Sequence, residues 1–247
     1  MAKHISKLFI IPVKFNVLII EHLKNNHVAL QYFQYLGSPN IGLFIIATDE
    51  FVLVPSGMSE SKIEFLKRCF KVDDVLSLRI RGSKLLGALS VANSNGVLLP
   101  YGCEREADLI REKLGVKAVS IETFISLGNR ILANDKAAIV DPQMPEEIVS
   151  IIKEVLNVKV ERSTIAGLPY VGSSAVVSNR AMYAHPKIRP DEVSLIEKVL
   201  DVQVHTGTVM NGLPYVKLGL VVNQKGGIVG RGTSGSELMA ISKCFSL

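Results

Sequence analysis

A pattern that recurs about every 44 residues constrains the fold of this chain more than any other feature of its sequence. Five apolar hairpins end at Pro55, Pro100, Pro142, Pro186 and Gly230, and the intervals between these ends are 45, 42, 44 and 44 residues. A fixed period of this length is typical of repeat architectures, in which no single repeat can bury its apolar face alone. The pattern therefore predicts one domain built from five modules.

Each repeat has the same predicted order of strand, turn, strand, helix and strand. The stretch VANSNGVLLP (91–100) shows the hairpin most clearly, and we expect Asn95 and Gly96 to supply positive φ angles in its turn. Asp49 and Asp135 stand at matching turn positions, where Asp often caps its own backbone, so we interpret both as turn formers. The helices that follow carry apolar residues at helical spacing, and the last strands alternate apolar with polar residues.

The fifth repeat lacks its last strand, because the sequence stops after the fifth helix at Leu247. The stretch 30–42 has the same layout as 160–172, and Gly37 precedes Gly82 by the period of 45 residues. We expect this N-terminal strand to complete the last module and close the ring, which removes exposed sheet edges. The predicted fold class is α/β: a closed, five-fold pseudosymmetric α/β propeller of strand-strand-helix-strand repeats.

Residues 1–27 do not follow the repeat and form an N-terminal extension. Its apolar part, 8–20, is shorter than the roughly 18 residues that span a bilayer, and no small-residue cleavage site of a secretory signal follows it. We expect the extension to be disordered, or absent from the natural product with synthesis starting nearer Val28. The predicted organisation is this extension followed by a single five-repeat domain, 28–247, with no membrane contact.

The net charge of +5 and the pI of about 9.0 suggest a nucleic-acid partner, but the distribution of charge weakens this interpretation. Residues 1–27 hold +3 of the total, and the remaining 220 residues carry 24 basic and 22 acidic side chains. The body of the protein therefore lacks the broad basic footprint of phosphate-backbone binders. We expect no DNA partner, and a general RNA-binding module remains an alternative.

Residues that could carry catalysis or bind a metal are few and poorly grouped. Cys69, Cys103 and Cys244 have no Cys or His at metal-ligand spacing, which argues against a metal site and a disulfide and for a reducing cytoplasm. Cys69 and Cys244 occupy a core position of their helices, whereas Cys103 lies at a hairpin-to-helix junction and its role stays open. His185 and His205 have no partner at a catalytic spacing. We therefore expect no catalytic residue, no cofactor and no enzymatic activity.

Several segments resemble, in the same order, those of the archaeal and eukaryotic translation initiation factor 6 family. The resemblance covers 28–247 and implies the pentein fold, a five-module α/β propeller; the absence of long acidic tails suits the archaeal form. The segments that carry it are SPNIG (38–42), NGVLLP (95–100), SLGNRILANDKAAIVDP (126–142), AMYAHP (181–186), TGTVMNG (206–212), LGLVVNQKG (218–226) and GTSGSEL (232–238).

The resemblance implies a role at the ribosome. Members of the family bind the intersubunit face of the large ribosomal subunit, where they contact a ribosomal protein near the sarcin–ricin loop of the RNA. They block joining of the small subunit sterically and accompany large-subunit maturation. We therefore expect a monomeric, cytoplasmic anti-association factor of translation initiation. The alternative within this fold is a guanidino-modifying hydrolase, which needs a Cys and a His in the central channel.

The same resemblance places the ribosome-binding surface on the loops that begin the hairpins of the early repeats. Ala88 departs from the family, which often has a basic residue at that position. For the glycines and asparagines of the set, turn geometry alone is the competing explanation. The residues at these positions are Asn40, Gly42, Gly87, Ala88, Asn93, Leu127, Gly128 and Asn129.

Overall fold

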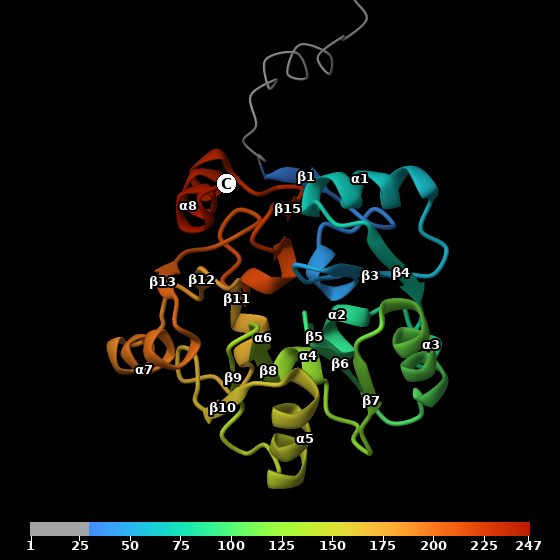
Figure 1. The fold of residues 1–247 in the computed structure, drawn as a ribbon. Coiled ribbons are helices and arrows are strands. Elements are labelled where there is room, and N and C mark those ends of the chain that lie inside the picture. The colour runs from blue at the N-terminus through green and yellow to red at the C-terminus, as the bar shows by residue number, and fades with distance from the viewer. Residues whose placement is uncertain (1–29) are drawn as a thin grey trace, which may run out of the picture.

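The computed structural model describes residues 30–247, and within them five similar modules lie around a common centre (Figure 1). The expectations for residues 1–27 lie outside the described residues. Each module contains a short helix, two strands, a long helix and a third strand. The bounds are η1 (Ile41–Leu43), β2 (Ile46–Ala47), β3 (Phe51–Pro55), α1 (Glu60–Phe70) and β4 (Asp74–Leu78) in the first module; α2 (Leu86–Leu89), β5 (Val91–Asn93), β6 (Gly96–Leu99), α3 (Glu104–Leu114) and β7 (Lys117–Ser120) in the second; α4 (Leu127–Arg130), β8 (Ile131–Ala133), β9 (Ala137–Val140), α5 (Glu146–Leu156) and β10 (Lys159–Arg162) in the third; α6 (Val171–Ser174), β11 (Ala175–Val177), β12 (Ala181–Ala184), α7 (Pro190–Leu200) and β13 (Gln203–Thr206) in the fourth; and η2 (Val216–Gly219), β14 (Leu220–Val222), β15 (Gly227–Gly230), α8 (Gly235–Phe245) and β1 (Gln31–Phe33) in the fifth.

Every module folds its strands into one three-stranded sheet with the same topology. The middle strand pairs antiparallel with the first strand and parallel with the third. In the fifth module the third strand is β1, which pairs with β15 so that Tyr32 lies opposite Val229. The prediction that an N-terminal strand completes the last module is therefore confirmed.

The five sheets remain separate. Within residues 30–247 no strand pairing joins one three-stranded sheet to another, so the closure that the sequence predicts does not take the form of a continuous sheet. What the structure supports is a mixed α/β fold of five repeated sheet-and-helix modules with five-fold pseudosymmetry. Among the described residues, no helix is long and apolar enough to cross a membrane.

The long helices join neighbouring modules, as α5 illustrates. Its acidic first turn (Glu146 and Glu147) suits the positive end of the helix dipole, and Asn157 ends it in the left-handed conformation with φ of 53°. Its buried stripe packs against its own sheet and also against Val91 and Leu98 of the preceding module. Because α1 likewise packs against strand residues of the fifth module, no module has a core of its own. The buried residues of α5 are Ile148, Val149, Ile152, Val155 and Leu156.

The hairpin turn of the second module differs from the sequence prediction. Asn93 pairs with Gly96, so the turn residues are Ser94 and Asn95, and neither Asn95 nor Gly96 has a positive φ. The expected positive-φ turn is therefore wrong. Gly96 is required for a different reason, since a Cβ added there would lie 2.3 Å from the carbonyl oxygen of Val155.

Candidate functional site

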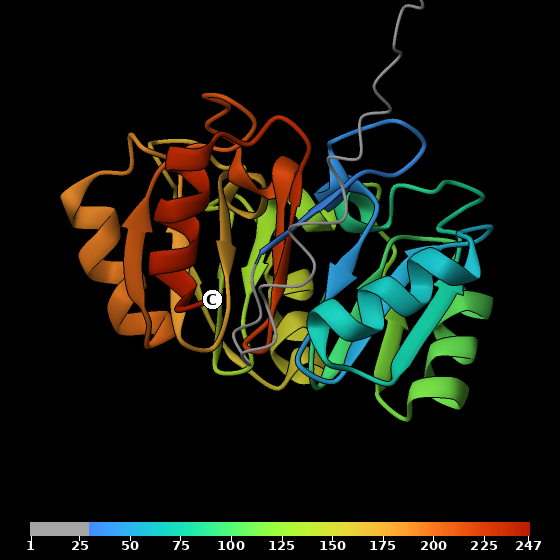
Figure 2. The same ribbon diagram turned by 90° about the horizontal axis from the view of Figure 1, so that it is seen from above.

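The five short helices surround one end of a central channel and define what we call the short-helix face. Each short helix contacts the next, from η1 through α2, α4 and α6 to η2, and η2 contacts η1. The third strands and the loops that follow them lead into this face, whereas the hairpin turns lie at the opposite end, which we call the hairpin face (Figure 2). The two ends differ in chemistry, and the predicted site residues divide between them.

Glycines allow the short helices to approach one another closely. A Cβ added to Gly87 would lie 2.2 Å from the carbonyl oxygen of Gly42, and one added to Gly128 would lie 2.0 Å from that of Gly87. Gly172 repeats the relationship with Gly128 at 2.3 Å. Since real Cβ atoms do not come this close to backbone oxygens, these predicted site residues have a packing role whatever else they do.

Four of the remaining predicted residues lie on the same face. Ala88 and Leu127 are buried, so they contribute little surface to a partner. Asn40, which precedes η1, and Asn129, within α4, are partly exposed. These two asparagines are the predicted site residues whose side chains a partner on the short-helix face can reach.

Asn93 lies at the hairpin face, apart from the other predicted residues. Its side chain is 3% exposed, and its Nδ2 donates to the carbonyl oxygens of Asn134 at 3.0 Å and of Leu156 at 2.9 Å. Its Oδ1 accepts from the backbone N–H groups of Asn95 and Gly96 and so shapes the turn. The resemblance grouped Asn93 with the early-repeat loops, but the structure places it at the far end of the channel. There its side chain hydrogen-bonds the second module to the third.

Two further asparagines make equivalent hydrogen bonds between modules. The Nδ2 of Asn134 donates to the carbonyl oxygen of Leu200, and that of Asn223 donates to the carbonyl oxygens of Thr48 and Phe70. Like Asn93, each of these side chains donates to a carbonyl at the C-terminal end of the next module's long helix, where the last carbonyls have no partner within the helix. The fifth module is thereby bonded to the first.

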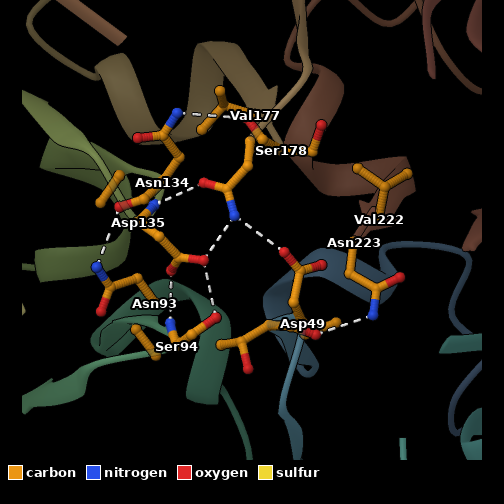
Figure 3. A pocket seen from close by; sticks show the side chains of 14 residues that line it. Asp49, Asn93, Ser94, Asn134, Asp135, Val177, Ser178, Val222 and Asn223 are labelled. Atoms are coloured by element: carbon orange, nitrogen blue, oxygen red, sulfur yellow. Dashed lines mark hydrogen bonds between the residues drawn. The ribbon is translucent and has the colours of Figure 1, made fainter. Parts of the chain in front are cut away.

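A network of polar side chains spans the channel at the hairpin face (Figure 3). The Nδ2 of Asn179 donates to both Asp49 and Asp135. Asp135 also accepts from the backbone and hydroxyl of Ser94, and Asp49 accepts from the backbone and side chain of Gln224. Our interpretation of Asp49 and Asp135 as caps of their own backbone is therefore wrong, because these carboxylates bond to neighbouring modules.

Large hydrophobic side chains gather on the short-helix face. Seven such side chains are exposed within residues 30–247, and five of them occupy loops or short-helix caps of this face. Phe124 is the most exposed of them at 78%. A cluster of exposed apolar side chains marks a surface for interaction with a partner, and the rings of Phe124 and Tyr101 form such a cluster. The five are Leu36, Leu85, Tyr101, Phe124 and Tyr170.

Arginines lie against two of these rings. The guanidinium of Arg81 is 5.3 Å from the ring centroid of Phe124, whose other neighbour is Tyr101 at 5.8 Å between centroids. The guanidinium of Arg130 lies 5.1 Å from the ring of Tyr170 and forms an ion pair with Asp141. These contacts combine apolar area with positive charge, which is the composition of an anchoring surface.

Two buried glutamates hold the loops that lead into α6 and η2. Glu192 accepts from the backbone N–H groups of Ala166 and Gly167, and Glu237 accepts from those of Asn211 and Gly212. Burial raises the pKa of each carboxyl, but these and further hydrogen bonds outweigh it, and the pKa of Glu237 falls to about 2. The loops at this part of the face are therefore fixed rather than free.

The channel offers little for catalysis by Cys and His. Its described lining residues at both ends include neither of these residue types. Cys103 is fully buried in the core cluster of the first two modules, where burial raises the pKa of its thiol. Within residues 30–247 no group of three or more His, Cys, Asp or Glu side chains is placed to hold a metal ion.

Sequence reasoning missed two features of the site. The first is the gathering of exposed rings on one face, which depends on loops from several modules and leaves no local signal. The second is Lys217, whose position could have been found: Gly42, Gly87, Gly128 and Gly172 each precede a turn position by seven residues, and the residue seven before the fifth turn position, Gln224, is Lys217.

The fold and the site together define a five-module α/β repeat protein, and within residues 30–247 five of its seven exposed large hydrophobic side chains lie on one face. The chain belongs to the eIF-6 family, whose sequence model matches residues 30–244. Among its relatives, proteins called Translation initiation factor 6 are 42% identical in Pyrococcus furiosus and 34% identical in Pyrococcus horikoshii, in each case over 87% of this chain and 98% of the relative. The protein of that name in Nitrosopumilus maritimus is 42% identical over 86% of this chain and 97% of its own length.

Proposed function

We propose that this protein is a ribosome anti-association factor, which binds the large ribosomal subunit and sterically prevents the small subunit from joining. The observation that carries the proposal is the collection of five exposed hydrophobic side chains on the short-helix face of a chain that belongs to the eIF-6 family. Its relatives are named as translation initiation factors, and we extend that role to this chain in the cytoplasm.

The composition of the face supports a partner that is largely protein at the contact. Phe124 and Tyr170 are exposed rings, each with an arginine against it, and aromatic and arginine side chains are the residues that most often anchor protein interfaces. Asn40 and Asn129 add polar groups within the same surface. The nearly balanced charge of 28–247 agrees with this, because a surface that bound mainly RNA phosphates would carry more positive charge. We expect a ribosomal protein of the intersubunit face as the main contact, with ribosomal RNA nearby.

Steric exclusion requires a body that keeps its shape. The glycine contacts at the short-helix face and the asparagine bonds at the hairpin face both link the fifth module to the first, through Gly42 with Lys217 and through Asn223 with Thr48. We infer from these two links that the five modules form a closed and rigid ring. Such a ring, held on the large subunit by one face, keeps the small subunit from the surface that it covers. We extend the proposal to late maturation of the large subunit, during which premature joining must also be prevented.

Sedimentation separates this proposal from the alternatives. Purified protein is centrifuged through a sucrose gradient with large subunits, with small subunits and with protein-free ribosomal RNA, at a salt concentration near 0.15 M, where the Debye length is about 8 Å. We expect it to move with the large subunit alone. Migration with free RNA would instead favour an RNA-binding module, and turnover of arginine derivatives would favour a guanidino-modifying enzyme.

A further inference from the structure

Lys217 occupies the fifth position of the glycine set. The backbone follows the pattern of the other modules, because a Cβ added to Gly42 would lie 1.8 Å from the carbonyl oxygen of Lys217. The side chain of Lys217 breaks this pattern, because the other four modules have glycine at the equivalent position. It extends to the third module, where its Nζ donates to the carbonyl oxygen of Gly128 at 2.5 Å. One lysine therefore spans the channel at the short-helix face.

The ammonium group of Lys217 has no acidic partner among residues 30–247. None of the ion pairs of the described part includes it, and burial alone lowers its pKa, to about 8. The carboxylates of the channel, Asp49 and Asp135, lie at the hairpin face, which seven residues of strand and short helix place roughly 15–20 Å away. Their oxygens already accept hydrogen bonds from Ser94, Asn179 and Gln224.

Among the described residues, the ammonium group of Lys217 therefore has one hydrogen bond to the protein and no carboxylate beside it. A lysine ammonium has three donors, and the carbonyl of Gly128 takes one of them. Removing an ammonium from water is costly unless an opposite charge or further hydrogen bonds compensate. Within residues 30–247 no acidic side chain forms an ion pair with Lys217 and so offsets this cost.

A cavity is available next to this ammonium. It has a volume of about 90 Å³ and is lined by Lys217 together with apolar side chains such as Ile131, Val176 and Leu220. Lys217 is half-buried and forms part of the wall of this cavity. This volume is enough for one small ion together with a few waters.

We propose that the channel is an anion-binding site, in which a small monovalent anion of the halide or nitrate class is held on the Nζ of Lys217. The two free donors of the ammonium hydrogen-bond the anion, and the apolar walls strengthen the attraction between the charges by excluding water. The anion neutralises the charge of Lys217 and so stabilises the contact between the third and fifth modules. The site faces the channel, and it stands independently of the proposed ribosomal role.

Crystals of the full chain grown or soaked in sodium bromide test the site directly. We expect an anomalous bromide peak in the channel within hydrogen-bonding distance of the Nζ of Lys217. Bromide peaks confined to the outer surface, or a channel containing only waters, would overturn the proposal.

Stability measurements provide the second test. The unfolding of the wild type is followed in sodium chloride, bromide or nitrate and in sodium gluconate, whose anion is much larger than the other three, at equal ionic strength. We expect the folding equilibrium constant to rise about tenfold when the small anion reaches ten times its Kd. The variant Lys217→Met should lose this response, whereas Lys198→Met, at an exposed position of α7, should keep it.

An equal response of the wild type and Lys217→Met would contradict the proposal. If Lys217→Met does not fold, bromide NMR of the wild type decides the matter. Saturable broadening of the bromide signal that nitrate reverses supports the site, and broadening that neither saturates nor reverses overturns it.

Discussion

The side chain of Asn93 donates a hydrogen bond of 3.0 Å to the backbone carbonyl of Asn134, which lies 41 residues later in the sequence. This bond joins the hairpin turns of the second and third modules, and Asn134 continues the arrangement toward the fourth with its own side chain. The relationship gives a structural account of a residue that the sequence had suggested as a contact for the ribosome. It also makes the stability of the five-module fold depend on a few buried asparagine side chains.

Replacing Asn93 should therefore destabilise the protein without altering its binding face. Asn93→Ala removes all four hydrogen bonds of this buried side chain, two between modules and two within the turn, so we expect a loss of about 2–4 kcal/mol in the free energy of unfolding. Urea denaturation measures it. Ser178→Ala is the matched control, because Ser178 holds the equivalent position but bonds only within its own turn, and it should cost about 1 kcal/mol or less. Equal losses for the two variants would argue against a role of the Asn93 side chain in holding the second and third modules together.

The glycine contacts predict a sharp difference between two Gly→Ala substitutions. At Gly128 the new methyl group would meet the backbone oxygens of Gly87 at 2.0 Å and Ser90 at 2.6 Å, and backbone cannot move aside as a side chain can. We expect Gly128→Ala to lose about 3 kcal/mol or more. Gly235→Ala, at the start of α8 where nothing lies within 4 Å, should be neutral or stabilising by up to about 1 kcal/mol. A thermal unfolding series that ranks the two variants equally would contradict the close approach of the short helices.

The carboxyl group of Glu237 predicts a loss of stability in acid. Burial raises its pKa, but hydrogen bonds led by those from Ser234 and Thr208 lower it from the ordinary 4.5 to about 2. A depressed folded-state pKa means that the contribution is complete above pH 4.5 and disappears as the pH falls toward 2. We expect about 3 kcal/mol of stability to be lost across this window. In Glu237→Gln the free energy of unfolding should vary less over the same pH range, and parallel profiles for variant and wild type would refute the assignment.

The order of elements could be predicted from the sequence because it repeats. Period, helical spacing and the displaced strand β1 are one-dimensional signals, and each leads to the observed modules. The turn around Asn95 differs from the prediction because Asn93, which precedes it, accepts hydrogen bonds from the backbone of Asn95 and Gly96 while its Nδ2 bonds to the third module, and the sequence does not show that second contact. The same holds for Asp49 and Asp135, whose partners belong to other modules.

The candidate site could be predicted only in part. The resemblance to a family indicated the loops around Asn40 and Asn129, and both are partly exposed on the short-helix face. Nothing in the local sequence of Phe124, Tyr101 or Arg81 shows that three separate loops bring them together. Contacts of this kind depend on the three-dimensional arrangement of the modules, which the period of the sequence does not reveal.

The exposed ring of Phe124 predicts where binding energy for the large subunit is concentrated. Truncating an aromatic anchor at an interface often costs about 2 kcal/mol or more, so Phe124→Ala should weaken binding about 30-fold. Met239→Ala is the matched control, because Met239 is 76% exposed against 78% for Phe124 but lies on α8 and outside the short-helix face. Titration of labelled protein with large subunits measures both, and a stronger effect at Met239 would place the contact on another surface.

The most direct test of the account is a subunit-joining assay with one change on each face. Light scattering follows the association of purified small and large subunits in the presence of wild type, Asn129→Glu or Gln203→Glu. Asn129 is partly exposed on the short-helix face, and Gln203 is exposed at the start of β13 near the hairpin face. An unpaired charge buried in an interface costs several kcal/mol, so Asn129→Glu should bind at least about 100-fold more weakly and no longer prevent joining. Wild type and Gln203→Glu should prevent it equally, with all three proteins folded. Full inhibition of joining by Asn129→Glu would contradict the proposed face, and failure of the wild type to inhibit joining would contradict the proposed function.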